Sequence, residues 1–196
     1  MILPNALLLF ISTGLVMGAS IQQRTDSVEA AEPYDERTVI GYALDERDDA
    51  AAQEDFKTAV VRQHNEARAK YGAGKLTWSD ALYADTQKWA NQCKFQHSGG
   101  NYGENLAAGT GNFGFKNGLD SWMSEASKYD YNHPGFSSET GHFTQVVWKN
   151  TKQVACAVGD CKAGTIFDQA SKYVVCRYSP PGNYQGQFPQ NVGRPQ

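Results

Sequence analysis

The chain has 196 residues and a formal net charge of -3, and 40% of its residues are hydrophobic, with 12% aromatic. This composition supplies a core for one domain and excludes a chain too polar to fold. Residues 20–55 hold eleven acidic and three basic side chains, whereas residues 56–196 hold ten acidic and fifteen basic. Because the basic excess of the second part is spread along the chain without a cluster, we expect no nucleic-acid partner.

The first twenty residues are typical of a secretory signal peptide. An apolar run at residues 6–11 is followed by small residues at 18–20, where cleavage is expected. The run is too short and too broken to predict a membrane span. We therefore expect a secreted, soluble protein.

An acidic leader precedes the predicted domain. Residues 21–52 contain few large apolar side chains, so they cannot bury enough surface to offset the entropy of ordering, and we expect disorder there. Ordered structure is expected from about Gln53, with one domain over residues 53–190 and a short tail at 191–196.

Helical periodicity marks the first half of this domain. The spacing of Phe56, Val60 and His64 predicts a helix over residues 54–71. Ser79 is a good N-cap for a second helix from Asp80 to about Cys93. A Gly-rich loop is expected next, followed by a third helix over residues 118–128.

Strand signals dominate the second half. The stretch Gly141–Thr151 reads GHFTQVVWKNT, and its alternation predicts a core strand over residues 143–148 with His142 at its entrance. Residues 153–158 and 172–178 predict two more strands, which complete a small antiparallel sheet. The Pro- and Gly-rich stretch after Tyr178 is expected to wrap irregularly over the surface.

Four cysteines in a chain bound for an oxidising compartment predict two disulfides. The residues are Cys93, Cys156, Cys161 and Cys176. Their spacing forms no paired CxxC units, which disfavours a structural zinc site. Spacing alone leaves all three pairings open.

Four motifs occur together in this order: HNEAR (64–68), GENL (103–106), GHFTQVVW (141–148) and YVVCRYSPPGNY (173–184). Over roughly residues 53–189 the chain resembles the CAP superfamily of cysteine-rich secretory, antigen 5 and pathogenesis-related class 1 proteins. It is most similar to the fungal secreted class, which includes the sterol-exporting proteins of yeast. The resemblance implies an α+β fold, an α-β-α sandwich with a small antiparallel sheet, and disulfides Cys93–Cys161 and Cys156–Cys176.

The resemblance also implies a polar cavity lined by His97, Glu104, Glu125 and His142. The imidazoles of His97 and His142 suit a weak zinc site completed by water, although the predicted function requires no metal. A metal-dependent hydrolase would use Glu104 or Glu125 as general base on a metal-bound water. A polar cluster that only holds a loop to a strand is the simpler alternative.

An aromatic loop after the third helix is the second candidate site. In sterol-binding relatives an aromatic loop in this region binds the sterol, and the resemblance assigns that role to Tyr129, Tyr131, Phe136 and Trp122. The helical spacing of Trp122 with Leu119 favours a core position for the tryptophan. For the other three aromatics, core packing and ligand contact remain open alternatives.

We predict no ligand for the other two histidines, His64 and His133, or for the C-terminal motif. We expect His64 to be buried in its helix and His133 to lie on a surface loop. Arg177 stands where plant relatives have an asparagine before a released peptide, which argues against such a peptide here.

We therefore predict a monomeric, non-enzymatic carrier that sequesters or exports sterols and related small hydrophobic compounds. The alternatives are the hydrolase above and a defence-type effector that acts through a protein partner.

Overall fold

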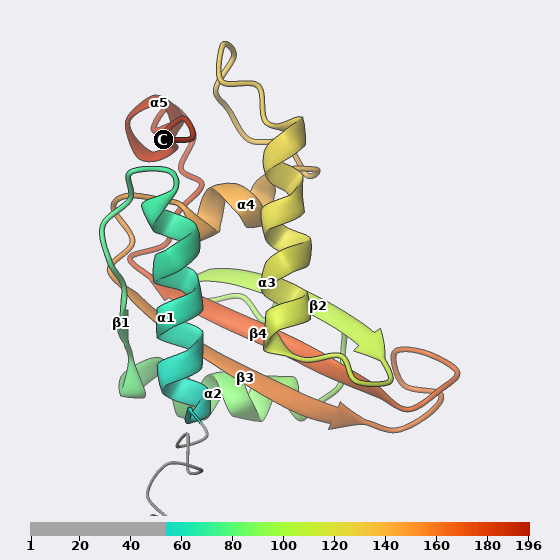
Figure 1. Ribbon diagram of the computed structural model, residues 1–196. Helices are drawn as coiled ribbons and strands as arrows, with labels where there is room; N and C mark the ends of the chain where they lie inside the picture. The colour runs from blue at the N-terminus through green and yellow to red at the C-terminus, as the bar shows by residue number, and fades with distance from the viewer. Residues whose placement is uncertain (1–53) are drawn as a thin grey trace, which may run out of the picture. The chain divides into compact units, whose positions relative to one another are not determined.

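The computed structural model describes residues 54–196 of the chain (Figure 1). The predicted signal peptide and acidic leader lie outside the described residues. Within residues 54–196, no helix is both long enough and apolar enough to cross a membrane.

The three long helices lie close to the predicted ranges. They are α1 (Phe56–Ala69), α2 (Asp80–Ala90) and α3 (Phe115–Ser124), and a short 3-10 helix, η1 (Glu125–Lys128), continues α3. The Asp55 side chain caps α1 by accepting the Thr58 backbone N–H at 3.0 Å. This contact satisfies one of the amides that a helix leaves unpaired at its N-terminus.

A four-stranded sheet forms the middle of the fold, in the order β1-β3-β4-β2. Its strands are β1 (Thr77–Trp78), β2 (Gly103–Thr110), β3 (Gln153–Cys161) and β4 (Ser171–Ser179). β4 pairs antiparallel with both β2 and β3, whereas β1 joins β3 in parallel. The predictions of β3 and β4 are confirmed, but β2 lies in the Gly-rich segment that was expected to be a loop.

Helices cover both faces of the sheet (Figure 1). On one face, α1 and α3 pack on Val174, Cys176 and Tyr178 of β4 in the larger core cluster. On the other face, Ala90 of α2 packs on Tyr173, among others, in a smaller cluster. Alternate residues of one strand thus serve two cores, and the expected α-β-α sandwich is confirmed.

The prediction of a strand over residues 143–148 is wrong. Residues 141–146 form a short helix, α4 (Gly141–Val146). All six residues from Phe143 to Trp148 are buried, so the alternation of residue types does not report an exposed and a buried face. Arg68 of α1 ends this helix by donating hydrogen bonds to the carbonyls of Val146 and Trp148 at 2.7 and 2.9 Å.

The C-terminal stretch is folded onto the domain. A one-turn helix, α5 (Phe188–Asn191), buries Phe188 completely, and Val192 also lies in the larger core cluster. The Asn191 side chain accepts the Asn150 N–H at 3.0 Å.

Candidate functional site

The four residues of the predicted polar cavity form two separate His–Glu pairs. His97 Nδ1 lies 3.0 Å from Glu104 Oε1, and His142 Nδ1 lies 2.7 Å from Glu125 Oε1. Among residues 54–196, no three of these side chains bring possible ligand atoms within 4.8 Å of one another. Each histidine is therefore positioned by a carboxylate through its Nδ1 atom. The Nε2 atom of each ring takes no part in this contact.

Glu104 of β2 is the centre of a buried ionic cluster. Its Oε2 accepts Arg177 Nε at 3.1 Å, and the side chains of Glu104 and Arg177 are only 5% and 4% exposed. The Ser98 backbone N–H donates to Glu104 Oε1 at 2.9 Å, and the Ser98 hydroxyl contacts Oε2. Burial by itself raises the pKa of Glu104, but the hydrogen bonds from Ser98, His97 and Arg177 outweigh it and lower the pKa. The carboxylate is therefore held in its ionised form.

Arg177 is placed by the sheet register, which sets it directly across from Glu104. Its second amino group donates to the Ser98 hydroxyl at 2.8 Å, and its guanidinium lies 4.4 Å from the centroid of the Tyr102 ring. These contacts compensate the desolvation of a buried cation.

Glu125 caps the short helix α4. Its Oε2 accepts the backbone N–H groups of His142 and Phe143, both at 3.0 Å. A carboxylate at this position satisfies two unpaired amides and interacts favourably with the helix dipole. The His142 ring also stacks on Trp122, with centroids 6.2 Å apart and planes 19° apart.

Asn105 connects the two pairs. It follows Glu104 in β2, and its side chain donates to the His142 carbonyl at 3.0 Å. A hollow of about 260 Å³ opens beside the first pair and is lined in part by His97, Glu104 and Gln145. Glu125 and His142 are not among its lining residues.

The aromatic loop is mostly packed down on the domain. Trp122 is 1% exposed and donates its indole N–H to the Leu106 carbonyl at 3.0 Å, as expected for a core residue. Tyr129 is 7% exposed and meets Tyr131 edge-to-face, with centroids 4.9 Å apart. Phe136 is 59% exposed. Phe136 is therefore the predicted loop aromatic that is most available to a ligand.

Both predicted disulfides are present. Cys93 is bonded to Cys161 and Cys156 to Cys176, and neither pair leaves a free thiol in the described chain. His64 is buried beside Cys156 and Cys176. Sulfurs that are bonded to each other are not thiolate ligands, so this cluster is no metal site.

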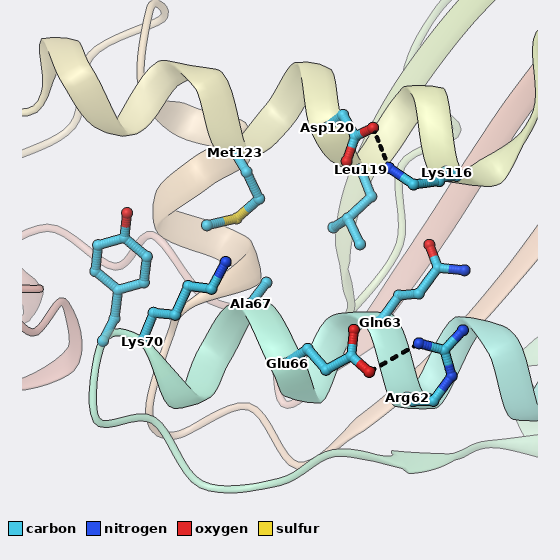
Figure 2. Close-up of a pocket in the computed structure, with 10 residues that line it drawn as sticks. Arg62, Gln63, Glu66, Ala67, Lys70, Lys116, Leu119, Asp120 and Met123 are labelled. Atoms are coloured by element: carbon cyan, nitrogen blue, oxygen red, sulfur yellow. Dashed lines mark hydrogen bonds and ion pairs between the residues drawn. The ribbon is translucent and has the colours of Figure 1, made fainter. Parts of the chain in front are cut away.

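A larger hollow of about 540 Å³ lies between α1 and α3 (Figure 2). Leu119 and Met123 of α3 point toward Ala67 of α1 across it (Figure 2). Ion pairs stand on its walls, Arg62 with Glu66 on α1 and Lys116 with Asp120 on α3. The hollow thus combines an apolar part with charged walls.

Sequence reasoning missed the partners that organise the two pairs: Ser98, Asn105 and Arg177. A signal existed for Arg177, because a charged residue in the apolar strand YVVCRY must find a buried partner. No comparable signal marks Ser98 or Asn105, whose roles depend on the fold of the chain around them.

Comparison with known proteins identifies relatives over most of the described chain. Residues 61–178 match the CAP family, described as the cysteine-rich secretory protein family. The chain is 44% identical over 143 residues to protein PRY2 of Saccharomyces cerevisiae and 42% identical over 157 residues to the secreted protein RBT4 of Candida albicans. These matches cover 70% and 72% of this chain but only 41% of each fungal protein.

Pathogenesis-related protein 1 of Arabidopsis thaliana is 37% identical over 141 residues, which are 69% of this chain and 83% of the plant protein. Among solved structures, MpPR-1i has a TM-score of 0.56 at 21% identity, and the match covers 70% of this chain and 97% of MpPR-1i. NaASP2 with Zn²⁺ has a TM-score of 0.56 at 24% identity, covering 70% and 86% of the two chains. The motifs, the sandwich and these relatives agree, and the chain belongs to the CAP family of cysteine-rich secretory proteins.

Proposed function

We propose that this protein is a secreted carrier that binds sterols and related small hydrophobic molecules at the aromatic loop over residues 129–136. The observation that carries the proposal is the 59% exposure of Phe136 on a loop whose base is fixed by buried Tyr129. The relative RBT4 is described as a secreted protein, which supports secretion.

A rigid, flat ligand suits such a loop. Aromatic rings offer a large contact area with little loss of conformational freedom.

The hollow between α1 and α3 supports the wider class of hydrophobic ligands. Its apolar part includes Leu119 and Met123, and Lys70 stands on its rim. Because six of its ten lining residues are polar or charged, a ligand here would have to be amphiphilic, with its apolar part against Met123 and its polar group near Lys70.

Equilibrium binding of a radiolabelled sterol to the purified chain, with a fatty acid in parallel, tests the proposal. Replacing buried Tyr129 would disturb the core, so the variant is Phe136→Ala, and Tyr184→Ala is the matched control because Tyr184 is also an exposed aromatic residue. We expect Phe136→Ala to weaken sterol binding about tenfold and the control to leave it unchanged. No saturable sterol binding by the unchanged chain would refute the carrier function.

A weak zinc site is a second proposal, which a specific contact favours. A ligating histidine usually gives its other ring nitrogen to a carboxylate, and both His97 and His142 show that carboxylate contact. The related NaASP2 structure with Zn²⁺ adds support. Zinc would bind through the imidazoles and polarise a bound water.

Calorimetric titration with zinc would show this site, and we expect His142→Ala to abolish the heat of binding while His133→Ala, on the surface, retains it. The hydrolase alternative gains less support. The oxygens of Glu104 and Glu125 already accept backbone, histidine or arginine donors, so neither carboxylate is free to act as general base.

A further inference from the structure

A third hollow lies apart from the His–Glu pairs and the aromatic loop. It measures about 410 Å³ and opens where the loop after α2 meets the loop between β3 and β4. Lys94 and Phe95 of the first loop line it, together with Ile166 and Phe167 of the second and Ala108 of β2. Most of these side chains are apolar.

Both aromatic side chains that line this hollow are exposed. Phe95 is 56% exposed and Phe167 is 41% exposed, although they come from segments about seventy residues apart in the sequence. The Phe95 ring packs against Tyr173 of β4, with centroids 5.7 Å apart. A fold that gathers exposed aromatics around one concavity forms a surface typical of binding sites.

The hollow is also preformed. The Cys93–Cys161 disulfide ties the two loops together. Within the second loop, the Gly164 N–H donates to the Phe167 carbonyl at 2.8 Å, and the Thr165 hydroxyl donates to the Lys162 carbonyl at 2.6 Å. Binding of a ligand would therefore lose little conformational entropy in ordering these walls.

The positive charge at the rim of the hollow favours a ligand with a negative group. Lys94 is the charged residue that lines the hollow, no acidic residue lines it, and Lys94 has no ion-pair partner within residues 54–196. Asp168 follows Phe167 but does not line the hollow. We infer that this hollow binds a small amphiphilic anion, with its apolar or aromatic body against Phe95 and Phe167 and its single negative group at Lys94.

Two fluorescent probes with one aromatic body separate the parts of this inference. Anilinonaphthalene sulfonate carries a negative group, whereas phenylnaphthylamine is neutral. Both are titrated into the purified full chain, and thermal unfolding checks that every variant is folded. The test variants are Phe95→Ser with Phe167→Ser, and Lys94→Gln. The matched control is Tyr184→Ser, which removes an exposed aromatic side chain that does not line this hollow.

We expect the double serine variant to weaken both probes about tenfold or more. Lys94→Gln should weaken only the anionic probe, by about three- to fivefold, and Tyr184→Ser should change neither probe. Unchanged binding in the double variant, equal effects of Lys94→Gln on both probes, or an equal loss in Tyr184→Ser would overturn the inference. Sterol binding by the double variant should remain intact, so this result is independent of the proposed carrier function.

Discussion

Acid should destabilise this protein through His64. The His64 ring is completely buried in α1, stacked on Phe115 with centroids 5.3 Å apart. Its Nδ1 donates to the Val60 carbonyl at 2.9 Å, and its Nε2 accepts the Tyr178 hydroxyl at 3.0 Å. This pattern fixes a neutral imidazole. A second proton would leave the Tyr178 hydroxyl without an acceptor, because the neighbouring Asn105 amide also donates to it.

The magnitude follows from the pKa of His64, which burial lowers from 6.5 to about 4, with a smaller contribution from the charge of Arg68. The folded state thus binds fewer protons than the unfolded state, so the stabilisation is fully present above pH 6.5 and is lost as the pH falls toward 4. Between about pH 7.5 and about pH 5 the expected loss is about 2 kcal/mol of unfolding free energy, and the full shift corresponds to about 3 kcal/mol.

Urea unfolding at constant ionic strength, monitored by tryptophan fluorescence at several pH values in this range, measures how steeply the free energy of unfolding changes with pH. His64→Phe should abolish most of the slope whatever its own stability, since phenylalanine does not titrate. The matched control is His133→Phe, because the His133 side chain is 87% exposed, and it should keep the slope. A slope that survives in His64→Phe would refute the assignment.

Three substitutions test the packing and charge contacts, each by urea unfolding. Arg68→Met removes the donor of four hydrogen bonds to backbone carbonyls, three of them buried, and should cost about 3 to 5 kcal/mol; a loss below about 1 kcal/mol would contradict this role. Gly159→Ala places a methyl group against the Ala90 carbonyl and should cost about 1 to 3 kcal/mol, whereas unchanged stability would mean that α2 shifts freely. Glu104→Gln leaves Arg177 buried without a countercharge and should cost about 3 kcal/mol, with Glu139→Gln on the surface as a neutral control.

The sequence itself determined the long helices and two of the strands. In α1, Val60, His64 and Arg68 recur every four residues, and all three are completely buried. The strands β3 and β4 were likewise readable, since each contains two valines and β4 adds two tyrosines, residues that suit a pleated surface. The disulfide count also follows from composition, whereas their pairing came from the resemblance.

Only the tertiary structure decided the secondary structure of the two segments that contain Glu104 and His142. The segment GENLAAGT has weak strand propensity, yet it forms β2 because all eight residues pair with β4. The segment GHFTQV reads as a strand, yet it forms α4 because Glu125 satisfies two of its first amides and Arg68 satisfies the carbonyl of its last residue, Val146.

The same distinction holds for the chemistry. The sequence and its resemblance named His97, Glu104, Glu125 and His142, but not their division into two pairs. That division depends on contacts between residues far apart in the chain, such as Arg177 with Glu104 across the sheet. Local propensity reports how a segment prefers to fold alone, whereas buried polar groups must be paired wherever the fold brings them, and that requirement decided the site.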